Sequence, residues 1–107
     1  MRLALVTLVV LFAALLGNPS DSRATPSAGA IICQVFGSYC SQALRVARCE
    51  SGMQTWAQNG QYLGLFQMGS YARARYGHGA DAWTQARAAY RYFRDAGYSW
   101  GPWSCKP

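Results

Sequence analysis

Acidic side chains are scarce in this chain. Its 107 residues include four aspartates and glutamates against ten lysines and arginines, and Glu50 is the single glutamate. There is one histidine, His78, and the four cysteines are not spaced as in a zinc site. No internal repeat, low-complexity stretch or linker divides the sequence. We therefore expect one domain, with no metal and no other cofactor.

A long apolar run occurs only near the N-terminus. Arg2 precedes the run, which covers residues 3–16, and Pro19 follows it closely. The run is shorter than the roughly 20 residues that a membrane helix needs. This order predicts a secretory signal peptide rather than an uncleaved membrane anchor. We place the signal peptide at residues 1–24, with Ala30 as an alternative last residue, and expect a secreted protein, extracellular or cell-wall-associated, with no stable membrane insertion after cleavage.

The cysteines suit a small secreted chain. Because 107 − 24 leaves 83 residues, one hydrophobic core is marginal and covalent links help. Four cysteines in such a chain suggest two disulfides, for which three connectivities exist. Cys33 and Cys40 are seven residues apart and could bridge locally. If Cys49 pairs with Cys105 instead of another cysteine, the bridge pins the C-terminal tail beside Glu50.

The net charge is +6, and +5 once Arg2, Arg23 and Asp21 are removed with the signal peptide. Basic secreted proteins are attracted to anionic surfaces such as cell-wall polymers, acidic membranes and nucleic acid. Plain solubility also explains so modest a charge. Because the arginines are dispersed along predicted helices and no nucleic-acid-binding motif occurs, we expect no nucleic-acid partner.

Hydrophobic spacing predicts a mainly α domain over residues 31–107, or α+β with a minor sheet. Residues 25–30 are expected to fray. The Asn59-Gly60 pair predicts the two-residue turn of a small hairpin. Ser41, Ser70 and Asp81 are the expected N-caps of three helices. Helical spacing predicts a short helix or turn within 31–39 and helices over 42–51, 71–76 and 82–96.

The segment YARARYGHG, residues 71–79, mixes basic and aromatic side chains. It could contact nucleic acid or glycan. An ordinary solvated helix with both tyrosines pointing inward explains the pattern equally well.

Glu50 has an unusual place in the predicted helix. It follows Val46 by four residues and Ala47 by three, so it shares the apolar stripe. Desolvation and the negative end of the helix dipole both favour a neutral carboxyl, the state that a general acid needs. The plainer alternative is an exposed glutamate at a frayed helix end.

Several short motifs resemble the lysozyme-like family of bacterial lytic transglycosylases. Within that family the chain is most similar to the small catalytic domain of actinobacterial resuscitation-promoting factors, over about residues 32–105. The resemblance implies a disulfide-linked, lysozyme-like fold. The motifs are CESG from Cys49, WA from Trp56, NGQY from Asn59, GLFQ from Gly64 and WGPWSC from Trp100.

The resemblance implies a peptidoglycan-cleaving enzyme with Glu50 as its catalytic residue. Glu50 would protonate the glycosidic oxygen between N-acetylmuramic acid and N-acetylglucosamine. It would then act as a base while the muramic acid C6 hydroxyl closes a 1,6-anhydro ring. Because the substrate supplies the nucleophile, the second carboxylate of ordinary glycosidases is not required. The resemblance also implies a Cys49–Cys105 bridge, and the expected partners of this monomer are peptidoglycan glycan strands.

The resemblance also indicates residues that bind the sugar. Gln67 matches a family glutamine that borders the cleft and contacts the sugar amide, and Asn59 and Tyr62 occupy cleft-lining positions. Trp56 and Tyr90 are aromatic candidates for platforms under sugar rings.

Two departures and three alternatives accompany this interpretation. Met53 stands where transglycosylases often carry an aromatic residue, and the run from Glu50 to Gln67 is one residue shorter than usual. A water held near Glu50 would give ordinary hydrolysis with the same acid. A non-catalytic glycan-binding or signalling module would keep the fold without turnover. A basic, disulfide-linked antimicrobial or nucleic-acid-binding protein would depend on charge alone.

Overall fold

The computed structural model describes residues 25–107, so the predicted signal peptide lies outside the described residues. This part is a small, mainly helical domain with a short β-hairpin, which confirms the predicted class. No helix within it is both long and apolar enough to cross a membrane. The elements are α2 (Ala28–Phe36), the 3₁₀ turn η1 (Gly37–Tyr39), α3 (Cys40–Ser51), β1 (Gln58–Asn59), β2 (Tyr62–Leu63), α4 (Ser70–Tyr76) and α5 (Ala82–Asp95).

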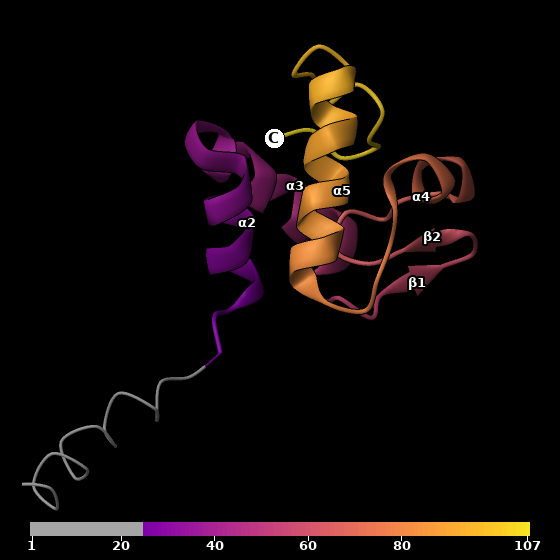
Figure 1. Ribbon diagram of the computed structural model, residues 1–107, viewed down its shortest axis with the longest axis horizontal. Coiled ribbons are helices and arrows are strands. Elements are labelled where there is room, and N and C mark those ends of the chain that lie inside the picture. The colour runs from indigo at the N-terminus through magenta and orange to yellow at the C-terminus, as the bar shows by residue number, and fades with distance from the viewer. Residues whose placement is uncertain (1–24) are drawn as a thin grey trace, which may run out of the picture.

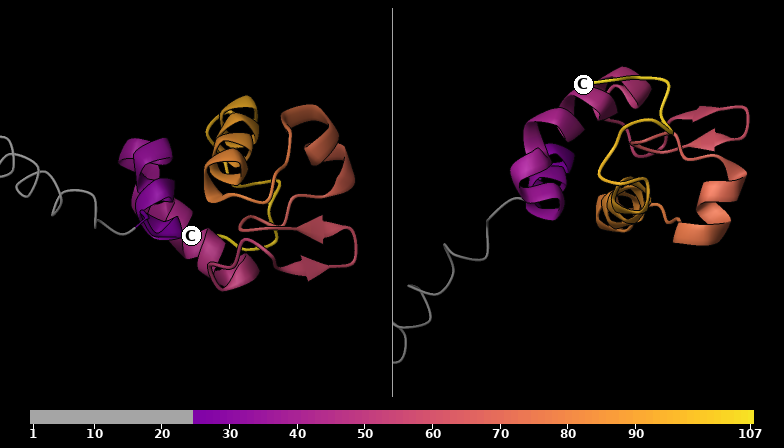
Figure 2. Two further views of the ribbon diagram at one scale, coloured as in Figure 1. Left: turned by 60° about the horizontal axis from the view of Figure 1, so that its bottom comes forward. Right: turned by 90° about the horizontal axis from the view of Figure 1, so that it is seen from above.

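Helix α5 stands at the centre of the domain (Figure 1), with α2 on one side and α4 and the hairpin on the other. Helix α3 packs against α2, to which η1 joins it. After α5 the chain turns back, and Figure 2 shows the C-terminal tail crossing from α5 toward α3. The domain thus brings the tail, which is distant in sequence, to the end of α3, where the hairpin and the loop that follows it also lie.

Helix α2 begins earlier than the sequence suggested. The Ser27 hydroxyl accepts a hydrogen bond from the Ala30 N–H at 3.1 Å, which caps the helix. The prediction that residues 25–30 fray is therefore wrong for Ala28–Ala30, which form the first turn. A signal cleavage after Ala30 would remove both the cap and that turn.

Two of the three predicted caps are wrong. Ser41 lies inside α3, because η1 runs directly into this helix, and its hydroxyl accepts from Arg45 at 2.9 Å. Ser70 is the first residue of α4 rather than its cap. Asp81 is confirmed, since its Oδ2 accepts from the Thr84 N–H at 2.9 Å. Hydrogen bonds from the Thr84 side chain and backbone hold the pKa of the Asp81 carboxyl below its usual value.

The hairpin turn is shifted by one residue from the prediction. Asn59 pairs with Tyr62, so the two-residue loop is Gly60-Gln61 and Asn59 ends its strand. Gly60 has φ +61° while Gln61 keeps a negative φ. A glycine with positive φ at the first loop position is the pattern of a type II′ turn, whereas Asn-Gly would favour type I′.

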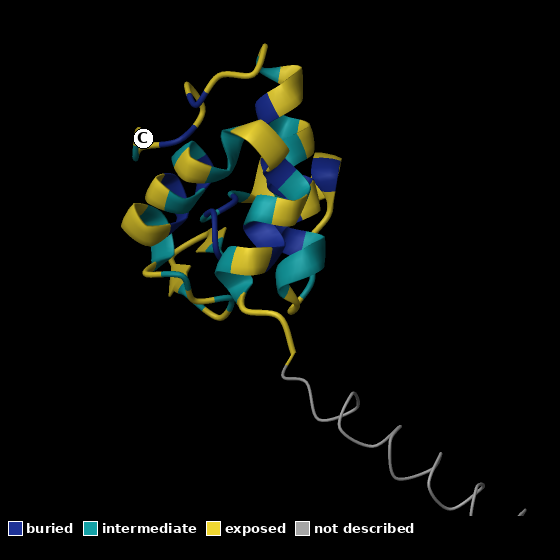
Figure 3. Ribbon diagram, turned by 90° about the vertical axis from the view of Figure 1, so that its left-hand side faces the viewer, coloured by how far each residue is buried: buried dark blue, intermediate teal, exposed yellow. Residues whose placement is uncertain are grey.

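Aromatic rings fill the core between α2, α5 and the tail. Phe93 lies 4.4 Å from Trp100 between ring centroids, and Phe36 lies 5.5 Å from Phe66. The buried faces of the helices meet in this interior, as the dark blue segments in Figure 3 show. Trp100 also donates from Nε1 to Gln42 at 2.8 Å. The tail is therefore part of the core and not an appended segment.

Gln85 is a polar residue inside this core, with an exposed fraction of 3%. Its Oε1 accepts from the Leu65 N–H at 2.8 Å. Its Nε2 donates to the carbonyls of Thr55 at 3.0 Å and Gly79 at 2.8 Å. One side chain of α5 thus fixes two points of the 55–66 segment, which carries the hairpin.

Both disulfides are present. Cys33–Cys40 closes the junction of α2, η1 and α3, with Cα atoms 4.4 Å apart. Cys49–Cys105 joins the last turn of α3 to the tail, with Cα atoms 6.0 Å apart. The second bridge matters most for the site, because it ends one residue before Glu50.

Candidate active site

Glu50 lies in the last turn of α3, which Gly52 ends in a left-handed conformation with φ +63°. Ala43, Val46 and Ala47 of the same helix are fully buried, as the predicted stripe requires. Glu50 itself is half-buried at the edge of this stripe. It is neither the freely exposed side chain of the plainer alternative nor a fully enclosed one.

The C-terminal tail holds one oxygen of the Glu50 carboxyl. The Cys105 N–H donates to Oε2 at 3.0 Å, and the adjoining disulfide fixes the same tail residue to Cys49. Oε1 forms no hydrogen bond with any residue in the 25–107 range that the structure describes. The carboxyl is thus oriented through one oxygen while the other stays free for a ligand.

The backbone of Leu65 and Phe66 is tied to Ser51, next to Glu50, and to the tail. The Ser51 hydroxyl lies 2.8 Å from the Leu65 carbonyl and 3.0 Å from the Ala47 carbonyl. Trp103 of the tail donates from Nε1 to the Phe66 carbonyl at 2.9 Å. These contacts connect the end of α3, the 64–67 loop and the tail into one framework around the carboxyl.

A cleft of about 540 Å³ opens beside Glu50. Its walls come from the end of α3, the hairpin, α4, α5 and the tail. Among the described residues that line it, Glu50 is the only charged one. The lining consists of Cys49, Glu50, Asn59, Gln61, Tyr62, Gln67, Met68, Gly69, Tyr71, Ala72, Tyr92, Pro102, Trp103 and Ser104.

The structure brings three of the predicted binding residues into this cleft together with Glu50: Asn59, Tyr62 and Gln67. Gln67 adopts φ +47°, which is uncommon for a residue other than glycine. Its Nε2 donates to the carbonyls of Gly64 at 3.0 Å and Ala57 at 3.2 Å. The Gln67 amide is therefore fixed in orientation, with its carbonyl oxygen left as an acceptor.

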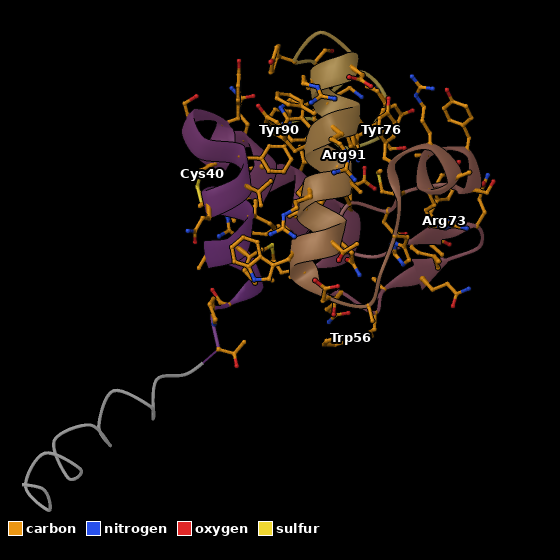
Figure 4. The ribbon with its side chains drawn as sticks, viewed as in Figure 1. Cys40, Trp56, Arg73, Tyr76, Tyr90 and Arg91 are labelled. Atoms are coloured by element: carbon orange, nitrogen blue, oxygen red, sulfur yellow. A yellow bond between two sulfur atoms is a disulfide. The ribbon has the colours of Figure 1, made fainter. Side chains whose placement is uncertain are left out.

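Trp56 and Tyr90 do not belong to the cleft. Trp56 is 76% exposed at the lower edge of the domain in Figure 4, in the turn before β1. Tyr90 projects toward α2 and packs edge-on against Phe36 at 5.3 Å. It shares the core-facing side of α5 with Phe93. Tyr90, predicted as a platform under a sugar ring, thus packs against the core.

The cleft side of α5 carries Tyr92, which the sequence analysis did not single out. Its ring lies between Tyr76 and Trp103, with centroids 5.1 Å from each. The sequence contained one signal for Tyr92. It comes two residues after Tyr90 and therefore points to another side of the helix. Trp103 lies in the recognised tail motif, but its contact with the cleft could not be read from the motif.

In the YARARYGHG segment, one of the two tyrosines points inward and the other does not. Tyr76 points inward, and its hydroxyl donates to Asp95 Oδ2 at 2.9 Å. Tyr71 is 69% exposed and lines the cleft, so the expectation of two inward tyrosines is wrong for it. One of the segment's two arginines serves the fold: Arg73 donates from Nη1 to the carbonyls of Gln61 and Met68.

The two other described acids lie away from the cleft. Asp81 caps α5. Asp95 accepts a hydrogen bond from the Tyr76 hydroxyl, and this bond together with Arg94 lowers the pKa of the Asp95 carboxyl. Residues 25–107 contain no group of three or more histidine, cysteine or acidic side chains that could hold a metal ion. The arrangement can therefore exchange one proton with a neutral polar ligand through Glu50.

Comparisons of the chain with protein-family models, with curated proteins and with solved structures found no match.

Proposed function

We propose that this protein is a secreted enzyme that cleaves the β-1,4 bond between N-acetylmuramic acid and N-acetylglucosamine in peptidoglycan, with Glu50 as general acid and base. The observation that carries the proposal is the isolation of this carboxyl. Among the described residues, Glu50 is the single charged side chain in a cleft otherwise lined by amide, hydroxyl, aromatic and small or apolar groups. Such a lining suits an uncharged sugar chain with polar edges and apolar faces.

The same lining argues against a function that depends on charge alone. The described part of the chain is basic, yet no arginine or lysine lines the cleft. Arg73 and Arg91 are engaged in hydrogen bonds to backbone carbonyls. A polyanion would find its partners dispersed over the surface, so we do not propose a nucleic-acid ligand.

The proposed reaction uses one carboxyl twice. Protonated Glu50 gives its proton to the glycosidic oxygen as the bond from that oxygen to C1 breaks and its electron pair passes to the oxygen. The resulting carboxylate then takes the proton of the muramic acid C6 hydroxyl while O6 bonds to C1. The Cys105 N–H holds the carboxyl in place through Oε2. Oε1 is the oxygen that remains for the substrate.

Among residues 25–107 no second acid lines the cleft, which supports this route over a two-carboxylate mechanism. Asp81 and Asp95 are both engaged elsewhere and line no part of the cleft. An internal hydroxyl nucleophile removes the need for a paired carboxylate. Attack by water held near Glu50 would give a muramidase with the same acid.

The proposal includes a lysozyme-like fold and an extracellular, cell-wall-associated location. A helix ending at the acid, a hairpin directly after it and a cleft between the hairpin and the following helices support the first. Two disulfides support the second, because such bridges persist in oxidising compartments.

The test is to incubate purified peptidoglycan with the mature protein or with its Glu50→Gln variant, and to identify the released fragments by mass spectrometry. Anhydromuramyl fragments from the first protein alone are the expected result. Reducing-end fragments would keep Glu50 as the acid but make the enzyme a hydrolase. Equal release by both proteins would overturn the role of Glu50.

One observation favours a second candidate, a module that binds cell-wall glycan without cleaving it. The Glu50 carboxyl already has a structural partner in the Cys105 N–H, so its presence alone does not require catalysis. Binding of glycan by both proteins with no fragments from either, on several wall types, would favour this module.

A further inference from the structure

Tyr62 of β2 lies directly over the backbone at Gly69. A Cβ atom built on Gly69 would come within 3.1 Å of Tyr62 Cε1 and 3.4 Å of Cδ1. The same Cβ would lie 3.3 Å from Gln61 Oε1. The contacts at 3.1 and 3.3 Å are tighter than ordinary packing, so a methyl group at position 69 would shift the Tyr62 ring and the Gln61 amide slightly. Gly69 thus seats the Tyr62 ring at the N-terminal end of α4, where both residues line the cleft.

Tyr71 follows Gly69 by two residues and lines the same cleft from the first turn of α4. Its exposed fraction is 69% and that of Tyr62 is 45%, which makes them two of the four large exposed hydrophobic side chains in the described range. Exposed aromatic rings cost free energy when they meet only water. Two of them beside one cleft therefore point to a ligand with apolar faces.

This wall of the cleft is braced by hydrogen bonds. Gln61 Oε1 accepts from the Ser70 N–H at 3.0 Å and from the Ser70 hydroxyl at 2.9 Å. Arg73 donates from Nη1 to the carbonyls of Gln61 and Met68, which joins the hairpin tip to α4. The two rings therefore stand on a preformed surface, and a ligand loses little free energy in ordering it.

We propose that Tyr62 and Tyr71 form a separate carbohydrate subsite, called here the tyrosine subsite. It takes the ring of an N-acetylhexosamine at a position other than the one where Glu50 acts. Glu50 stands on the wall made by α3 and the tail, whereas the tyrosine subsite belongs to the wall made by β2 and α4. The subsite determines how tightly a glycan strand is held and not how fast its bond breaks.

The chemistry of the wall selects a sugar among ligands with apolar faces. Asn59 and Gln61 contribute amides beside the rings, and no charged residue of the described range lines the cleft on this side. A sugar ring offers C–H faces to the tyrosines and hydroxyl or acetamide groups to the amides. The inference rests on the proposed function for the identity of the glycan, but it does not require that cleavage occurs.

The test measures binding of a β-1,4-linked N-acetylglucosamine hexamer by titration calorimetry in the Glu50→Gln protein, so that cleavage does not interfere. Adding Tyr71→Ala should weaken binding about 3- to 10-fold, the size of one aromatic contact. Tyr71→Phe should keep most of the affinity, since the ring stays. Gly69→Ala should weaken binding less than Tyr71→Ala does, because its methyl group shifts the Tyr62 ring only slightly. Trp56→Ala is the matched control, because Trp56 is more exposed but lies outside the cleft, and it should leave the affinity unchanged.

Thermal unfolding of each variant separates loss of binding from loss of fold, and Tyr71→Ala should unfold at nearly the parent temperature because Tyr71 is exposed. Unchanged affinity in Tyr71→Ala, or an equal loss in Trp56→Ala, would overturn the tyrosine subsite even if the enzyme cleaves peptidoglycan. If the folded parent binds neither the hexamer nor peptidoglycan, the proposed function fails and the subsite fails with it.

Discussion

The backbone N–H of Cys105 donates to Glu50 Oε2 at 3.0 Å, across 55 residues of sequence. This bond makes the last residues of the chain part of the environment of the proposed acid. The neighbouring Cys49–Cys105 bridge links the end of α3 to the tail beside this hydrogen bond. The carboxyl therefore has a structural role and a proposed chemical role, and substitutions can separate them.

Glu50→Gln and Glu50→Ala should differ in stability but agree in activity. Glutamine keeps an oxygen that accepts from the Cys105 N–H, so its unfolding free energy should stay close to that of the parent. Alanine leaves this half-buried N–H without its partner, at about 1 kcal/mol. Both should lower the cleavage rate about 10²- to 10⁴-fold, because neither can transfer a proton. Denaturant unfolding and fragment release measure the two effects, and a fully active glutamine variant would contradict the second.

The two disulfides should contribute unequally. Cys49–Cys105 spans 56 residues and Cys33–Cys40 spans seven. On the chain-entropy model, replacing both cysteines of the long bridge with serine costs about 4 kcal/mol, and of the short bridge about 2 kcal/mol.

Activity gives a second, independent comparison of the bridges. Loss of the long bridge should reduce cleavage even at temperatures where the variant is folded, because Glu50 loses its fixed partner. Loss of the short bridge, which closes the α2–α3 junction away from the cleft, should leave cleavage per folded molecule unchanged. Equal losses of activity in the two double variants would show that the tail does not position the acid.

Gln85 should be among the most sensitive positions in the domain. Gln85→Leu leaves one buried backbone group, the Leu65 N–H, and two half-buried ones, the carbonyls of Thr55 and Gly79, without partners, and should cost about 2 kcal/mol or more. The control Gln54→Leu, at an exposed position, should change the unfolding free energy by less than about 0.5 kcal/mol. Similar losses in the two variants would contradict the bracing role of Gln85.

Gly64 and Gln85 should be coupled. Gly64 has φ +83°, and a Cβ there would lie 2.5 Å from Gln85 Oε1. Gly64→Ala should therefore destabilise the domain through backbone strain and displacement of the buried amide. In the double variant with Gln85→Ala the displacement no longer counts, so the total loss should be smaller than the sum of the single losses. Additive losses would show that the two residues act independently.

These residues also show how far the sequence could predict the structure. Helical spacing identified the buried face of α3 and the core-facing side of α5, because burial of apolar groups imposes that period. A lone glutamine such as Gln85 carries no such signal, since a polar residue in an amphipathic helix usually marks the wet side. Its burial depends on backbone groups in a loop 20 to 30 residues earlier.

Some residues of the candidate site could likewise be predicted from the sequence, and others could not. Glu50, Asn59, Tyr62 and Gln67 lie close together in sequence, and the structure places all four around one cleft. The sequence analysis named Tyr90 for the cleft and not Tyr92. Which of the two faces the cleft depends on how α5 packs, which the sequence alone does not show. The tail contact with Glu50 follows from a disulfide pairing that the residues alone left open among three connectivities.

At low pH, two exposed aspartates should determine how the stability of the domain depends on pH. Asp95 has its pKa lowered by the Tyr76 hydroxyl and by Arg94, and Asp81 has its pKa lowered by Thr84. A carboxyl whose pKa is lower in the folded than in the unfolded state stabilises the fold above the unfolded value, about 3.9. This contribution is lost as pH falls through the folded pKa, so the melting temperature should drop below about pH 4.

Asp95→Asn isolates one of the two contributions. Asparagine keeps an oxygen for the Tyr76 hydroxyl but does not titrate, so the melting temperature should fall less steeply below about pH 4 than in the parent. His78 acts in a separate window, because burial and Arg73 lower its pKa and its protonation opposes folding below about pH 6.5. Melting curves between about pH 2 and 8 resolve the two windows. Parallel curves for the parent and Asp95→Asn below about pH 4 would mean that the Tyr76–Asp95 hydrogen bond does not favour the ionised carboxyl, and the acid sensitivity would then have to come from Asp81.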